Sequence, residues 1–195
     1  MGTGIANKRV GSCRLTAGNC LPQQFRHTQI VQEEKDWFAT KNMRGGTLLM
    51  TEIRELKPEE FFLAEQLWEQ YRDQKADPAH ERIFGFFVDG ELAATARFTR
   101  HSDGNEMDCV FTAEKFRGNG YARHVVEALI KTCGAETIYI HSTIVLISFY
   151  RTFGFTPIPE EQLPRSIRER FIFCFGEMQG CNVCPMVRNP GDRLS

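Results

Sequence analysis

The sequence predicts an α/β (α+β) fold, built on a mixed, mostly antiparallel central sheet with helices on both faces. Three observations lead to this expectation. Apolar segments within residues 83–112 are separated by turn signals, as in an antiparallel meander. Stretches with helical spacing follow and alternate with short apolar segments. Strands that come first in a meander and then alternate with helices favour a sheet covered on both sides.

The domain is expected to begin with a strand and a helix. Residues 48–56 alternate well enough for a strand. Pro58 follows at a place where the first helical turn tolerates proline. Apolar residues from Ala64 to Tyr71 then recur at i, i+3, i+4 and i+7, which defines one face of a helix. Residues 73–81 are polar and typical of a loop.

Three strands of the meander follow. Residues 83–88 are apolar and aromatic, and Asp89-Gly90 is a hairpin signal that leads into a returning strand over 92–98. Residues 102–105 mark a second turn, and residues 106–112 form the third strand.

The second half alternates helices with strands. Residues 122–133 keep helical spacing for three turns, and Gly134 suits a helix C-terminus. A short strand is expected over 137–141 and a helix over 144–153. A further helix over 162–175 and a final strand over 182–187 complete the chain.

Composition excludes several classes of partner. The chain has 195 residues, of which 42% are hydrophobic and 25% charged, with a net charge of -1. No global basic field attracts nucleic acid. No apolar run approaches the roughly 20 residues that span a bilayer. Seven cysteines, an odd number without an apolar leader, favour a reducing compartment, and we expect a cytoplasmic protein.

Residues 1–46 differ from the rest and are interpreted as a disordered or loosely attached extension, with the folded domain over 47–195. The extension has no acidic residue before Glu33 but carries several basic ones. An acid-poor start of this kind also suits organelle targeting by residues 1–32, which remains an alternative.

A cysteine-containing segment, residues 174–184, closes the domain. Cys181 and Cys184 have the C-x-x-C spacing of a zinc knuckle, but only Cys174 lies near them and a fourth ligand is missing. Reduced thiols beside the final strand are the preferred interpretation, so no metal is expected. A redox pair is the remaining alternative.

A glycine-containing segment joins the third strand of the meander to the following helix. It reads Arg117-Gly118-Asn119-Gly120-Tyr121-Ala122. Glycines let a backbone approach a ligand closely. The first N–H groups of a helix have no partner within it, and the helix dipole favours an anion there. The segment therefore predicts a pyrophosphate cradle, with Arg117 and Arg123 adding positive charge.

These residues resemble the acetyl-CoA motif of the GNAT acyltransferase superfamily, Arg/Gln-x-x-Gly-x-Gly/Ala. Arg117, Gly120 and Ala122 occupy its three defined positions. Residues 150–155 resemble the family's Tyr-x-x-x-Gly-Phe segment. The chain differs from many members at Glu114, where proline is common, and at Thr143, where an asparagine contacts the cofactor.

The resemblance implies acetyl-CoA as co-substrate and direct attack of an amine on the thioester. In the family the strand before the cradle splays from its neighbour, which frees backbone groups at positions that match Val110 and Thr112. Tyr150 would donate a proton to the leaving thiolate. The implied cofactor contacts are Val110, Phe111, Thr112, Arg117, Gly118, Asn119, Gly120, Tyr121, Ala122, Arg123, Thr143 and Tyr150.

Several residues are candidates for the general base. Strand alternation puts Glu106 and Asp108 on one face with Val110 and Thr112. By resemblance to the histone-acetylating branch, Glu106 is a candidate, and Asp108 is a comparable one. His101 and His141 are further candidates.

Two functions fit these observations. The first is an N-acetyltransferase that acts on the primary amine of a small molecule, amino acid or peptide. The alternative is a catalytically inactive GNAT-fold module that binds CoA or a partner. No motif identifies the acceptor, and a homodimer is compatible with either function.

Overall fold

The computed structural model describes residues 40–44, 47–70, 74–175 and 182–192. All of them belong to the second of two compact units into which the chain divides, Lys35–Ser195. The expected extension over residues 1–46 lies outside the described residues except for Thr40–Arg44, which form a strand.

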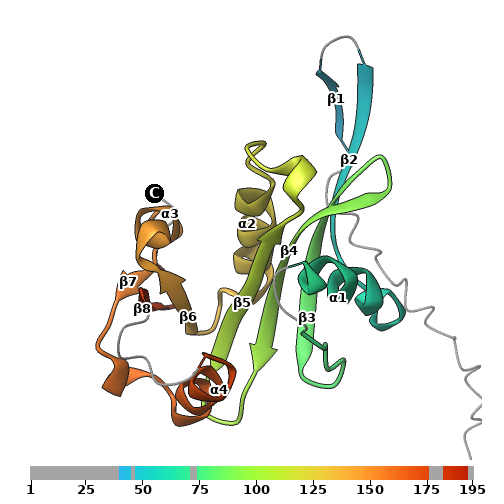
Figure 1. Ribbon diagram of the computed structural model, residues 1–195. Coiled ribbons are helices and arrows are strands. Elements are labelled where there is room, and N and C mark those ends of the chain that lie inside the picture. The colour runs from blue at the N-terminus through green and yellow to red at the C-terminus, as the bar shows by residue number, and fades with distance from the viewer. Residues whose placement is uncertain (1–39, 45–46, 71–73, 176–181, 193–195) are drawn as a thin grey trace, which may run out of the picture. The chain divides into compact units, whose positions relative to one another are not determined.

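One sheet organises the described part of the chain. Its strands run in the spatial order β1-β2-β3-β4-β5-β6-β8-β7 (Figure 1). Neighbouring strands are antiparallel except β5 and β6, which are parallel. The strands are β1 Thr40–Arg44, β2 Thr47–Glu55, β3 Glu81–Val88, β4 Glu91–Arg100, β5 Asn105–Thr112, β6 Ile138–Thr143, β7 Thr156–Pro157 and β8 Val183–Arg188.

Helices pack on both faces of this sheet. Helix α1, Phe61–Glu69, buries Trp68 and its neighbours in one apolar cluster with Ile83 and Phe87. Helix α2, Tyr121–Cys133, buries its apolar stripe in a second cluster on the other face. The predicted mixed, mostly antiparallel sheet with helices on both faces is therefore confirmed.

Two shorter helices lie near the C-terminal strands. The helix expected over 144–153 begins as a 3-10 turn, Ile144–Leu146, and continues as α3, Ile147–Arg151. Helix α4 spans Arg165–Phe175, three residues later than the expected start at 162. Pro164 explains the later start, because the residue before a proline disfavours helical dihedrals.

A β-bulge interrupts the pairing of β4 with β5. Thr95 pairs with Phe111 and Arg97 with Asp108, so two steps on β4 correspond to three on β5. Cys109 accommodates the extra residue with a positive φ of 47°. A bulge of this kind bends the strand and redirects the side chains beyond it.

The bulge corrects the expected alternation along β5. Asp108 reaches Arg97, whose guanidinium lies 5.0 Å from the Trp68 ring on the α1 face. Val110 instead packs against the α2 cluster. Val110 thus lies on the opposite face from Asp108, contrary to the alternation inferred from sequence, because the extra residue shifts the two-residue period by one.

Two side chains hold the bulge in place. The indole Nε1–H of Trp68 donates to Thr95 Oγ1 at 2.9 Å, and the Thr95 hydroxyl donates to the carbonyl oxygen of Cys109 at 3.0 Å. Thr95 is fully buried. Since buried polar groups are costly when unpaired, this chain stabilises the bulged conformation over regular pairing.

Replacing Thr95 by valine tests this role. Thr95→Val keeps the shape but leaves the Trp68 indole and the Cys109 carbonyl without this partner. Each unpaired buried group costs about 1–3 kcal/mol, so we expect the free energy of unfolding to fall by roughly 2–4 kcal/mol. Chemical denaturation measures it.

The matched control is Thr132→Val, in α2. The Thr132 hydroxyl donates to the carbonyl of Ala128 on its own helix, at 3.0 Å. We expect a change within about 0.5 kcal/mol there. Equal effects of the two substitutions would contradict a special role for Thr95.

Candidate active site

The loop between β5 and α2 has the geometry expected of an anion cradle. Gly118 and Gly120 adopt positive φ angles of 77° and 79°, and Gly120 is the N-cap of α2. A Cβ atom added at either glycine would meet no heavy atom within 4 Å. The backbone in front of α2 is therefore open to a ligand, and the helix N-terminus behind it favours a phosphate.

Side chains around the loop divide into two groups. Arg117 is exposed at its mouth, with its guanidinium 5.9 Å from the Phe111 ring. Its Nε donates to the Thr112 carbonyl at 3.4 Å. Asn119 braces the loop from within, because its Nδ2 donates to the carbonyl of Phe116 at 2.8 Å.

The side chains of Tyr121 and Arg123 contact neighbouring elements of the fold. The Tyr121 ring stacks on Phe86 at 4.2 Å. Arg123 donates to Thr152 Oγ1 at 3.1 Å and lies over the Phe153 ring of the same segment at 5.1 Å. The positive charge that we expected Arg123 to add at the loop is thus directed at the C-terminal end of α3. Ala122 is half-buried in the first turn of α2, where it has only a small side chain.

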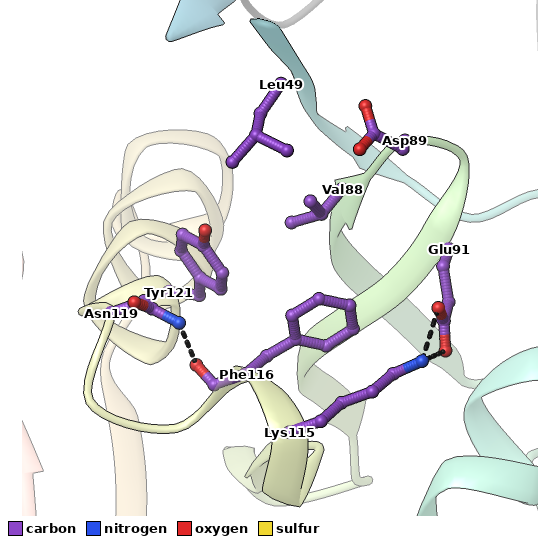
Figure 2. A pocket seen from close by; sticks show the side chains of 8 residues that line it. All are labelled: Leu49, Val88, Asp89, Glu91, Lys115, Phe116, Asn119 and Tyr121. Atoms are coloured by element: carbon purple, nitrogen blue, oxygen red, sulfur yellow. Dashed lines mark hydrogen bonds and ion pairs between the residues drawn. The ribbon is translucent and has the colours of Figure 1, made fainter. Parts of the chain in front are cut away.

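An open hollow of about 420 Å³ lies beside the loop. Eight side chains line it, among them Phe116 and Tyr121, which face Val88 and Leu49 across the hollow (Figure 2). Lys115 and Glu91 form an ion pair at 2.6 Å on its rim. No residue of β5 or β6 contributes to this hollow, so it is separate from the strand opening described next.

Strands β5 and β6 separate soon after they begin (Figure 1). They pair only at Asn105 with Ile138 and at Glu106 with Tyr139. Beyond these pairs β5 remains bonded to β4, and β6 to β8. The facing edges from residues 107 and 140 onward therefore present backbone N–H and C=O groups that an extended ligand with amides can use.

Tyr150 and Thr143 lie at the other side of this opening. Tyr150, in α3, is buried in the α2 cluster with edge-on contacts to Phe149 and Phe155. Burial and the negative charge of Asp108 raise the pKa of its phenol, so it keeps its proton at neutral pH. Thr143 is exposed at the end of β6, where it caps the following 3-10 turn.

Glu106 is buried and has three basic side chains beside it. Its Oε2 is 3.0 Å from His101 Nε2 and 2.7 Å from Arg170 Nη1, and its Oε1 is 3.8 Å from His141 Nδ1. Burial alone would raise the pKa of Glu106. The hydrogen bond from His101, the neighbouring His141 and the positive charge of Arg170 together outweigh the effect of burial and lower the pKa to about 2. A carboxylate this acidic is a weak base at neutral pH.

Asp108 is held by two guanidinium groups. Arg97 binds it through both oxygens, at 2.7 Å and 2.6 Å, and Arg170 contacts Oδ2 at 2.8 Å. Arg97 also contacts Glu81 at 3.2 Å. Asp108 thus belongs to a network of charges in which its lone pairs are directed at cations rather than at an open site.

The sequence reading missed both arginines of this network. Arg97 had a detectable signal, because an arginine between apolar neighbours in a central strand needs a buried partner. Arg170 had none, since only the packing of α4 brings it to β5. Ser166 fixes that packing through hydrogen bonds with Asp103 of the β4–β5 turn.

The described cysteines form no metal site. Cys109, Cys133 and Cys184 are free thiols, and no group of three or more metal-ligating side chains occurs within the described ranges. Cys174 and Cys181, which the zinc alternative requires, have side chains outside the described set. In the same ranges no helix has the length and apolar character needed to cross a membrane.

Comparison with known proteins identifies this architecture. The sequence profile of the acetyltransferase (GNAT) family matches residues 48–155, more than half of the chain. The matched range begins in β2 and ends after α3, and so contains the loop, the strand opening and Tyr150. A search of curated proteins finds no match.

Solved structures share the fold at low sequence identity. N-acetylglutamate synthase from Neisseria gonorrhoeae, complexed with coenzyme A and N-acetyl-glutamate, has a TM-score of 0.56 and 17% identity over 72% of this chain and 35% of the synthase. Escherichia coli ElaA has a TM-score of 0.52 and 20% identity over 72% and 100% of the two chains. The ribosomal-protein-S18-alanine N-acetyltransferase from Escherichia coli has a TM-score of 0.52 and 16% identity over 72% and 94%. The match spans about a third of the synthase, and these likenesses establish the fold alone.

Proposed function

Because the chain belongs to the acetyltransferase (GNAT) family, we propose that it transfers an acetyl group from acetyl-CoA to the primary amine of a small molecule, an amino acid or a peptide. The observation that carries the proposal is the combination of an open glycine loop at the start of α2 with the separation of β5 from β6. The loop suits the pyrophosphate, and the unpaired strand edges suit the amides of the pantetheine arm.

Each end of the transfer has a matching group. An N–H of the free β5 edge, at Val110 or Thr112, would stabilise the oxyanion that forms at the thioester carbonyl. The C–N bond forms as the C–S bond breaks, and the leaving thiolate takes the proton of the Tyr150 phenol. The raised pKa of Tyr150 keeps that proton available throughout the neutral range.

The acceptor class rests on chemistry and on likeness. Two of the similar structures are an N-acetylglutamate synthase and a ribosomal-protein-S18-alanine N-acetyltransferase, so their names refer to an acetylated amino acid and to an alanine of a protein. The α1 face beside the opening carries Glu81, Glu106 and Asp108 against Arg97 and Arg170. The carboxylates in this set outnumber the guanidinium groups by one, which favours an acceptor that arrives as a cation.

The alternative is a module that binds CoA without turnover. Its support is specific: Thr143 stands where many members have asparagine, and cations hold both carboxylates expected as bases. A thiol-release assay with acetyl-CoA and a panel of amines separates the two functions. Binding of acetyl-CoA without release across the panel would favour the module.

The loop assignment is tested by Gly120→Glu. The substitution places a carboxylate where phosphate is expected and forces a non-glycine residue into positive φ, and we expect acetyl-CoA affinity to fall at least about 100-fold, or roughly 2.7 kcal/mol. Isothermal titration calorimetry measures the affinity, and thermal denaturation confirms folding.

Gly191→Glu is the matched control for this experiment. Gly191 also has a positive φ, 88°, with open space around its Cβ position, but it follows β8. We expect its substitution to leave affinity unchanged. If both variants bind acetyl-CoA like the unaltered protein, the phosphate loop has been assigned wrongly.

The role of Tyr150 is tested by Tyr150→Phe. The ring and its edge-on contacts remain, while the proton donor is removed. A positioned acid contributes about 10²–10⁴-fold, so we expect kcat to fall by that factor with acetyl-CoA affinity within about threefold. Steady-state thiol release and calorimetry provide the two values.

Tyr139→Phe serves as the control, because Tyr139 lies in the paired part of β6. The kcat of the Tyr139→Phe variant is expected to stay within about threefold of that of the unaltered protein. An equally small effect of Tyr150→Phe would remove the phenol from the mechanism.

A further inference from the structure

His141 is a buried imidazole at the strand opening whose ring nitrogens have no hydrogen-bond partner among the described residues. It is the second residue of β6 after Tyr139, the last residue paired with β5. Its side chain is only 6% exposed. A buried polar group without a partner is costly, and such groups are retained where they have a catalytic or binding role.

The surroundings of His141 distinguish its two nitrogens. Nδ1 lies 3.8 Å from Glu106 Oε1. His101 and Arg170 both bind the other oxygen, Oε2, which leaves Oε1 directed at the imidazole. A carboxylate beside Nδ1 favours the tautomer with the proton on Nδ1, so that Nε2 carries the lone pair.

Three elements supply Glu106, which lies next to the ring, and the two groups that bind Glu106. Glu106 approaches from β5, His101 from the β4–β5 turn, and Arg170 from α4. Phe171 of α4 stacks on the ring at 4.1 Å. Burial raises the pKa of Glu106, but His101, His141 and Arg170 together lower it, so an ionised carboxylate lies beside the imidazole at neutral pH.

His141 and Tyr150 serve opposite faces of the sheet. Tyr150 belongs to the apolar cluster on the α2 face. His141 contacts Glu106 and α4, with the charged network that includes Asp108 and Arg97 on the α1 face. An acceptor on the α1 face would thus meet a base, while the thiolate leaves toward an acid on the other face.

We propose that His141 is the general base of the acetyl transfer, with Glu106 as the residue that positions it, an assignment that rests on the proposed function. The acceptor ammonium first gives one proton to His141 Nε2, which frees the lone pair of its nitrogen. That nitrogen bonds to the acetyl carbon as the C–S bond breaks, and the leaving thiolate takes the Tyr150 proton. The second proton of the nitrogen restores the Tyr150 phenol, and His141 releases its proton to solvent. Because Phe171 covers the ring, the acceptor reaches Nε2 by displacing that side chain.

The test compares His141→Gln with Glu106→Gln and the unaltered protein. Thiol release is measured from pH 5.5 to 9 at saturating acetyl-CoA, with an alkylamine and with methoxyamine, whose nitrogen is unprotonated at neutral pH. Calorimetry with acetyl-CoA follows binding, and circular dichroism follows folding. His124→Gln is the control, because that histidine is exposed on α2 and pairs only weakly with Glu127, at 3.7 Å.

Loss of the base has a specific signature. We expect His141→Gln to bind acetyl-CoA normally and to lose about 10²–10⁴-fold in kcat with the alkylamine. We also expect it to lose the rise of kcat that the unaltered protein shows as the pH increases from about 5.5 to 8. With methoxyamine the loss should be at least tenfold smaller. The Glu106→Gln variant should retain the rise of kcat with pH, but at lower pH, since removing the carboxylate makes the imidazole less basic.

Three outcomes would overturn the assignment. Retention of kcat and of the pH rise by folded His141→Gln excludes His141 while leaving the proposed function intact. If His141→Gln does not fold, the Glu106→Gln variant decides the assignment. Loss of the rise of kcat with pH in that variant would make Glu106 the base, whereas a shift of this rise to lower pH would support His141. Binding of acetyl-CoA by the unaltered protein without turnover of any amine removes the proposed function, and the base with it.

Discussion

The early end of pairing between β5 and β6 is the constraint on which the candidate site depends. Two parallel neighbours would normally continue their hydrogen bonds, since unpaired backbone groups inside a protein are costly. Here each strand is held on its other side instead, β5 by β4 and β6 by β8 over its whole length. The opening is therefore maintained by the rest of the sheet, and its free edges remain available to a ligand.

The bulge at Cys109 gives this opening two chemically different sides. Before it, Glu106 and Asp108 face α1 and the charged network, whereas beyond it Val110 faces the apolar cluster of α2. Trp68 and Thr95 reach the Cys109 carbonyl through hydrogen bonds, so α1 contributes to the conformation of β5 as well as covering the sheet. A proton donor and a charged network can therefore lie close together without sharing one environment.

Helix α4 determines what the acidic residues of β5 can do. Arg170 contacts both Glu106 and Asp108, and Phe171 covers His141. Carboxylates that look equivalent along the strand thereby become ion-pair partners, and the imidazole beside them has no hydrogen-bond partner among the described residues. Arg97 contributes from the sheet itself, with its guanidinium between Asp108, Glu81 and the Trp68 ring.

Local sequence pattern was sufficient to predict the order of the secondary-structure elements and the position of the glycine loop. The order of strands and helices was predicted from the periodicity of apolar residues and from the turn signals at Asp89-Gly90 and Gly134. The loop was predicted from Gly118 and Gly120. All of these signals act over a few residues. Tertiary structure alone decided the bulge at Cys109, the turn of Arg123 toward α3 and the partners of Glu106. Those depend on contacts between residues far apart in the chain, such as Arg170 with Glu106, and no local pattern records which distant charge will neutralise a carboxylate.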